Sequence, residues 1–95
     1  MAAVYILHST NLNRFYIGSC NDLTERLAQH LNKVFRESFT AKADDWVLFL
    51  SINDLDYTQA RDIEKHIKKM HSTSYIKNLK EYPDMRERLK QKYAQ

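Results

Sequence analysis

Hydrophobic residues near the N-terminus fall into two short runs separated by a polar segment. Residues 3–7 (AVYIL) and 14–18 (RFYIG) are rich in β-branched and aromatic residues, which is typical of strands, and residues 9–13 (STNLN) have the composition of a turn. The pattern therefore predicts a β-hairpin. If residues 9–12 form a four-residue loop, the numbers of paired residues sum to 21 and Tyr5 lies directly opposite Tyr16.

Three later segments have apolar residues at helical spacing. Asn21 is the expected N-cap of a helix that runs to about residue 36, with Asp22 near its positive end. Asp56 and Gln59 form a capping-box pattern at the start of a second helix, and Pro83 suits the first turn of a third. The positions expected to face the core are Leu23, Leu27, Leu31 and Val34 in the first helix, Ala60, Ile63, Ile67 and Met70 in the second, and Met85, Leu89 and Tyr93 in the third.

Residues 46–52 (WVLFLSI) form a continuous apolar run, which predicts a buried central strand. The expected element order is ββαβαα. This order indicates a small α/β domain in which helices flank a three-stranded antiparallel sheet. Ninety-five residues suffice for one core, so we expect residues 1–95 to form a single domain.

Composition limits the class of protein. The chain is 43% hydrophobic and 12% aromatic, as expected for a folded domain, and its single cysteine, Cys20, excludes an internal disulfide and a cysteine-based zinc site. Without a basic leader or a long apolar run, we expect no signal peptide, no membrane span and a cytoplasmic location. Residues 55–95 carry 10 Lys and Arg against 6 Asp and Glu, whereas residues 1–54 carry 5 against 6. A basic C-terminal half suits a nucleic-acid partner, although many solvated helices have the same charge.

The predicted hairpin carries the first candidate functional residues. Facing tyrosines stabilise sheets, so Tyr5 and Tyr16 alone are more often structural than catalytic. Gly18, the only glycine, follows Tyr16 by two residues and is expected on the same face. Its missing side chain would leave the phenols open to a closely approaching ligand. The alternative is a simple bend at the end of the strand.

Two predicted helices add charged candidates, each with a structural alternative. Arg26 and His30 lie four residues apart and share a helical face, where they could bind a phosphate and move a proton, but Arg26 could equally pair with Asp22 and His30 could be a surface histidine. Glu64 lies at the border of an apolar stripe and could bind a hard cation such as Mg²⁺. Its alternative is a Glu64–Lys68 pair at i, i+4. Together, these residue types are the set that phosphodiester hydrolysis requires.

Taken in order, the motifs resemble those of the GIY-YIG nuclease superfamily. Residues 3–5 (AVY) and 16–18 (YIG) resemble the two halves of the motif that names the family, with Ala3 in place of the first glycine. Residues 26–30 (RLAQH) are similar to its RLxxH helix, and residues 60–68 (ARDIEKHIK) to the helix that carries its metal-binding carboxylate. Asn78, in residues 77–79 (KNL), resembles a late asparagine of the family. The resemblance covers residues 2–80.

The resemblance implies a metal-dependent endonuclease that cuts DNA, with RNA not excluded. The implied catalytic residues are Tyr5, Tyr16, Arg26, His30 and Glu64, and Glu64 would hold one Mg²⁺ or Mn²⁺ ion. The implied nucleic-acid contacts are Gly18, Lys68, Lys77 and Asn78. Tyr5 would orient or deprotonate the attacking water. Deprotonation requires a depressed tyrosine pKa or a proton transfer to a neighbour such as His30.

Two other classes of function fit the same sequence. One is a nucleic-acid-binding module of the same fold that does not cut, or cuts only with a partner. The other is a structural or protein-interaction domain in which the tyrosines serve the core. A homodimer and a partner protein are both open, because no surface for self-association is marked in the sequence.

Overall fold

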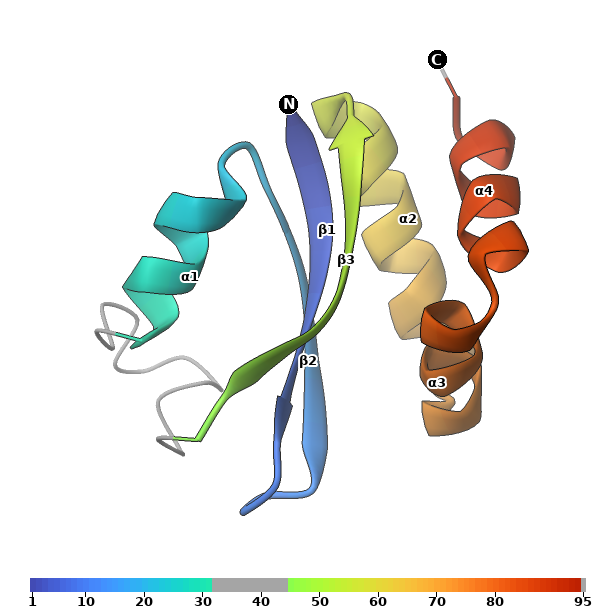
Figure 1. Ribbon diagram of the computed structural model, residues 1–95. Helices are drawn as coiled ribbons and strands as arrows, with labels where there is room; N and C mark the ends of the chain where they lie inside the picture. Colours follow the sequence, from blue (N-terminus) through green and yellow to red (C-terminus); the bar gives the residue numbers. More distant parts are fainter. Residues whose placement is uncertain (32–44, 95) are drawn as a thin grey trace.

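The protein, described here from a computed structural model, is an antiparallel sheet between two layers of helices. Residues 1–31 and 45–94 are described, with the side chains of residues 30 and 31 left out. The elements in chain order are β1 (Ala2–Ser9), β2 (Arg14–Cys20), α1 (Leu23–Leu31), β3 (Val47–Leu55), α2 (Tyr57–Met70), α3 (Thr73–Glu81) and α4 (Pro83–Lys92). The strand order is β2-β1-β3, and α1 covers one face of the sheet while α2, α3 and α4 cover the other (Figure 1). The expected α/β fold with a three-stranded antiparallel sheet is confirmed.

The first hairpin forms as expected, but its register differs. Tyr5 pairs with Gly18 and Leu7 pairs with Tyr16, so the numbers of paired residues sum to 23 and the expected sum of 21 is wrong. Because the shift is two residues, Tyr5 and Tyr16 keep a common face and lie diagonally across the two strands. Their ring centroids are 6.2 Å apart.

The cause of the shift is that Ser9 belongs to β1 and the loop begins one residue later. The Ser9 side chain is fully buried, donates a hydrogen bond to Asp45 Oδ1 and accepts one from the Leu12 backbone N–H. The loop then closes with a hydrogen bond from Asn13 N to Thr10 O (3.2 Å). Asn13 has a φ of 50°, a left-handed conformation that asparagine tolerates better than most residues.

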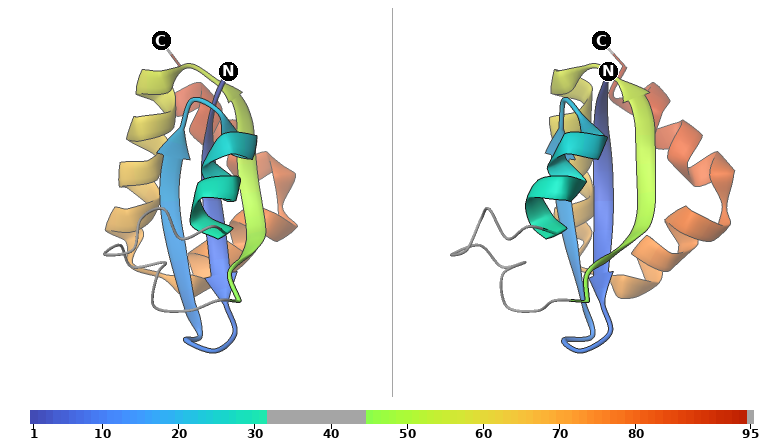
Figure 2. Two further views of the ribbon diagram at one scale, coloured as in Figure 1. Left: turned by 90° about the vertical axis from the view of Figure 1, so that its left-hand side faces the viewer. Right: turned by 60° about the vertical axis from the view of Figure 1, so that its left-hand side comes forward.

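The central strand is β1, not the apolar run at residues 46–52. In β1, Ala2, Val4 and Ile6 contribute to the core under α2–α4, whereas Ala3, Tyr5 and Leu7 contribute to the core under α1. The apolar run lies largely in β3, which is an edge strand (Figure 2, right). Val47 is 60% exposed and Leu48 is 44% exposed, so the prediction of a buried central strand at 46–52 is wrong.

Local capping explains where the helices begin. Asp22 Oδ1 accepts a hydrogen bond from Glu25 N (3.1 Å), so Asp22 and not Asn21 caps α1. The predicted end of this helix near residue 36 lies outside the described residues, as does Val34. At α2 the capping box of Asp56 and Gln59 is confirmed.

The C-terminal region contains a helix that the sequence pattern did not predict. Ser72 caps α3 by accepting a hydrogen bond from Tyr75 N (3.1 Å), and only Ile76 and Leu79 of this helix are buried. Two buried positions give too weak a periodicity to indicate a helix, so the order among the described residues is ββαβααα instead of ββαβαα. The predicted start of α4 at Pro83 is confirmed. Each described helix is too short or too polar to cross a membrane.

Candidate active site

The structure brings Tyr5, Tyr16 and Arg26 together between the sheet and α1. Both tyrosines belong to the cluster under α1, where the Tyr16 ring also meets Trp46 edge to face with centroids 6.5 Å apart. Arg26 hydrogen-bonds to the Tyr5 side chain. The Tyr5 ring is fully buried, whereas Tyr16 and Arg26 are half-buried. Solvent and substrate can therefore reach Tyr16 but not Tyr5.

Burial determines the acid–base character of Tyr5. Desolvation raises its pKa well above the usual range, and the neighbouring Tyr16 raises it further, while Arg26 lowers it by a smaller amount. A tyrosine base would need a depressed pKa. The raised pKa is opposite in direction to what a tyrosine base would need, so at neutral pH the Tyr5 hydroxyl keeps its proton, and the role of Tyr5 in catalysis stays a prediction.

Gly18 is buried in β2 directly opposite Tyr5. A Cβ atom at this position would lie 2.5 Å from the Tyr5 hydroxyl oxygen and 2.6 Å from Cζ. The close approach that the sequence indicated is thus made by the protein's own phenol, which fills the space left by the missing side chain. Contact between Gly18 and nucleic acid stays a prediction.

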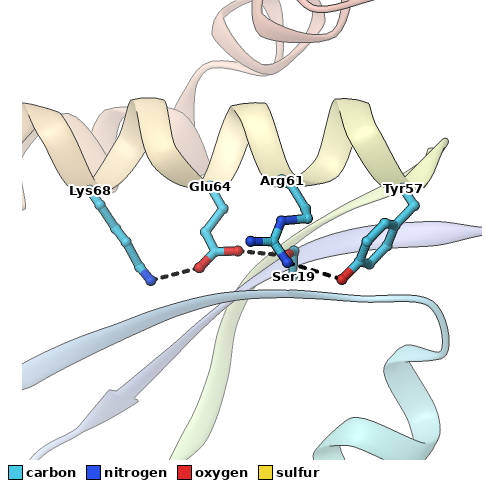
Figure 3. Close-up of polar contacts among 5 residues, drawn as sticks. All are labelled: Ser19, Tyr57, Arg61, Glu64 and Lys68. Atoms are coloured by element: carbon cyan, nitrogen blue, oxygen red, sulfur yellow. Dashed lines mark hydrogen bonds and ion pairs between the residues drawn. The ribbon is translucent and has the colours of Figure 1, made fainter.

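The second candidate group lies on the other face of the sheet. Glu64 projects from α2 toward β2, where its Oε1 accepts a hydrogen bond from Ser19 Oγ (2.5 Å) and its Oε2 pairs with Lys68 Nζ (2.6 Å) (Figure 3). The Glu64 side chain is 19% exposed and that of Lys68 is 53% exposed. The i, i+4 pair weighed from the sequence is therefore present. Since β2 is an edge strand, nothing in the sheet separates this group from solvent.

Sequence reasoning missed two neighbours of Glu64. Ser19 follows Gly18, and strand alternation alone places it on the face opposite Gly18. Arg61 lies one helical turn before Glu64, and its Nη1 donates a hydrogen bond to the Tyr57 hydroxyl (3.1 Å). Figure 3 shows a row of side chains along this side of α2. Residues 57, 61, 64 and 68 are three or four positions apart, so their spacing could have predicted that they share one face of the helix.

A groove lies along the free edge of the sheet at β2. It runs between the start of β2, the end of α2 and the start of α3, with a volume of about 890 Å³. Tyr16, which belongs to the tyrosine group, and Lys68, the partner of Glu64, both line it. A single substrate lying over the β2 edge could therefore meet residues from both faces of the strand.

The structure gives less information on the other predicted site residues. His30 lies in α1, but its side chain is outside what the structure describes. Lys77 and Asn78 are exposed on α3. Their roles stay predictions.

Comparison with known proteins gives one family. The sequence model of the GIY-YIG catalytic domain matches residues 1–80, which is most of the chain. Neither the curated proteins nor the solved structures gave a significant match.

Proposed function

Since this chain belongs to the GIY-YIG catalytic domain family, we propose that it is a divalent-metal-dependent endonuclease that hydrolyses phosphodiester bonds in DNA. The family accounts for nuclease-type chemistry in general; DNA and the metal ion are our proposals. The observation that carries them is the groove at the β2 edge, where Tyr16 and the Glu64 partner Lys68 line one surface. A phosphate lying there would adjoin Tyr16 from the first group and the lysine that pairs with Glu64, whereas Glu64 itself does not line the groove.

Glu64 is the residue that we propose to hold a single Mg²⁺ or Mn²⁺ ion. Magnesium prefers oxygen ligands and keeps several waters, so one carboxylate with the neighbouring Ser19 hydroxyl suits it. Three or more His, Cys, Asp or Glu side chains gather nowhere among the described residues, which fits such a water-rich ion better than an all-protein cage. When bound, the ion would supply Lewis-acid stabilisation of charge on the phosphate.

The other candidate residues have separate roles in the proposed mechanism. Arg26 offers a planar fork of donors to the phosphate as negative charge develops. Tyr5, which keeps its proton, positions Arg26 through their hydrogen bond. We assign Tyr16, the more accessible phenol, to orienting the attacking water, and His30 to accepting its proton. Lys68 neutralises Glu64 in the protein alone and would bind phosphate once an ion takes over that charge.

The decisive experiment is a substrate panel. Purified protein is incubated with supercoiled plasmid, branched DNA and RNA, each with Mg²⁺, Mn²⁺ or EDTA. We expect cleavage of DNA only when a divalent ion is present, and loss of that cleavage in Glu64→Gln. Glu87→Gln is the matched control, because Glu87 also pairs with a lysine on an exposed helix (3.7 Å to Lys90) but lies on α4.

Two results would oppose the proposal. Binding of nucleic acid without cleavage of any substrate would favour the alternative of a binding module that is inactive or needs a partner. Cleavage that survives Glu64→Gln with unchanged metal dependence would remove Glu64 from the metal site. Salt dependence tests the third class, since weak, salt-independent association would indicate a protein-interaction domain.

A further inference from the structure

The side of α2 that faces α4 carries a second hollow, which no residue of the proposed cleavage site lines. Its volume is about 590 Å³, and its lysines are Lys65 and Lys69 from α2 and Lys92 from α4. The two helices lie side by side (Figure 1) and are joined at the hollow by a hydrogen bond between His66 Nδ1 and the Tyr93 hydroxyl (2.9 Å). The lysines therefore project from two helices that are held against each other.

The lining of this hollow has an excess of positive charge. It contains the three lysines and one acid, Asp62. All three lysines are exposed, and none of them forms an ion pair with an acid among the described residues. Burial lowers the pKa of His66, and the charges of Lys92 and Lys69 lower it further, so both ammonium groups lie near the same ring. Like charges grouped in this way attract an anion, because their fields add.

The preference of lysine for helix ends accounts for only part of this grouping. Lysine is favoured in the last turn of a helix, where Lys69 and Lys92 both lie. That preference explains neither Lys65, in the middle of α2, nor the convergence of the two helix ends on one hollow. The grouping is therefore better explained by a shared ligand.

The exposed surface of α2 connects these lysines to the proposed metal site. Successive residues of an α-helix are rotated by about 100°, so Lys65 lies about 60° around α2 from Lys68, and Lys69 lies about 40° farther in the same direction. Lys68 in turn pairs with Glu64. A long anion that extends from Glu64 around α2 therefore meets Lys65 first, and then Lys69 and Lys92.

We propose that Lys65, Lys69 and Lys92 bind backbone phosphates of duplex DNA on one flank of the cleaved bond. The inference rests on DNA being the substrate, as proposed above, and adds a contact surface outside the cleavage site. Lysines are flexible point charges that contact phosphates without reading bases, so this contact should be independent of sequence. Lys92 lies beyond the residues 1–80 that the family model matches, so the surface uses a helix outside the matched region.

The salt dependence of binding measures these contacts without any cleavage. In EDTA, fluorescence anisotropy gives the affinity for a labelled blunt duplex from about 50 to 200 mM NaCl. Each lysine that contacts a phosphate contributes about 0.9 to the slope of log K against log salt concentration, so Lys69→Gln/Lys92→Gln should reduce the size of that slope by about 2. The control Lys80→Gln/Lys90→Gln removes the same charge from other positions on α3 and α4, and should change the slope much less.

Lysine footprinting on the unsubstituted protein gives a second measurement. The protein is acetylated briefly with and without the duplex, and the modification of each lysine is measured by mass spectrometry. We expect the duplex to protect Lys65, Lys69 and Lys92, but not Lys80 or Lys90. Polyglutamate is the comparison anion, since an acidic protein would present carboxylates in place of phosphates.

The outcomes separate this inference from the nuclease proposal. Equal slopes for the two double variants, or no protection of the three lysines by the duplex, overturn the inference even if the protein cuts DNA. Protection by polyglutamate alone also overturns it and indicates an acidic protein as the partner. The expected slope change together with protection by the duplex supports the inference even if no DNA is cut, and the nuclease proposal alone then fails.

Discussion

Replacing Gly18 with alanine tests the packing between the two strands that carry the tyrosines. The backbone is not the obstacle, since Gly18 does not have a positive φ. The obstacle is the Tyr5 ring. The new Cβ would lie 2.5 Å from its hydroxyl oxygen, 2.6 Å from Cζ and 3.0 Å from Cε1, whereas unstrained carbon contacts are about 3.5–4.0 Å.

The cost depends on whether the Tyr5 ring can move. Its side chain is fully buried, packs on Tyr16 and hydrogen-bonds to Arg26, so a shift of about 1 Å disturbs both neighbours. Overpacking of this kind costs about 1–3 kcal/mol, and we expect the upper part of that range. Alanine regains about 0.5–1 kcal/mol over glycine in a strand. The net loss in free energy of unfolding is therefore about 2 kcal/mol.

Urea denaturation of a double-mutant cycle isolates the contact. Gly18→Ala is measured in the wild-type, Tyr5→Phe and Tyr5→Leu backgrounds. Tyr5→Phe removes only the hydroxyl and leaves Cζ, so Gly18→Ala should still be destabilising in that background, but by less than in the wild type. Leucine removes the clashing ring atoms, so Gly18→Ala should become neutral or slightly stabilising there, with a coupling energy of about 2–3 kcal/mol.

Two outcomes would refute the reasoning. If the free energy of unfolding of Gly18→Ala lies within about 0.5 kcal/mol of the wild-type value, the Tyr5 ring can move aside with little loss of packing. An equal cost in the wild-type and Tyr5→Leu backgrounds would mean that the clash lies elsewhere. A change in the urea m-value would indicate altered compactness instead of a local contact.

Two further predictions concern protonation and capping. In the unfolded chain the Tyr5 phenol loses its proton near pH ~10, whereas burial keeps it protonated in the folded protein, so stability is lost as pH rises above that value. Tyr5→Phe should flatten this alkaline decline in chemical denaturation, and an unchanged slope would contradict the burial argument. Asp56→Ala breaks the capping box of α2 and should cost about 1 kcal/mol in thermal unfolding, while cleavage by the folded protein stays within about twofold. A larger loss of cleavage would mean that the start of α2 takes part in catalysis.

Most helices and strands could be predicted from the sequence, because the residues that define their ends lie close together in the chain. The capping box at Asp56, Pro83 at the start of α4 and the two runs of the hairpin each depend on residues only a few positions apart. The helix α3 was missed because its signal is weak, with two buried residues and a serine cap. The exposed edge position of β3 could not be read from composition, since it depends on which strand lies at the centre.

In the candidate site too, the sequence indicates which residues take part, whereas their arrangement depends on the fold. The order and spacing of the motifs, through their resemblance to the family, selected Tyr16, Arg26 and Glu64 as candidates, but the arrangement of these residues in space depends on the sheet. Alternation along β2 places Tyr16 and Ser19 on opposite faces, and Glu64 meets Ser19 on the α2 side. One substrate could reach both groups only over the free edge of β2, and the position of β2 at the edge is a property of the strand order.

Register was the least predictable feature, and the Gly18 cycle also tests it. The hydroxyl that holds Ser9 in β1 bonds to Asp45, 36 residues away, so no local rule could have moved the loop by one position. In the register predicted from the sequence, Gly18 would face Ala3, and an added methyl group would meet only another methyl group. Gly18→Ala would then change the free energy of unfolding little in every background. A large coupling to Tyr5 is therefore expected only if these two residues are paired, which is the arrangement that places the phenol against Arg26.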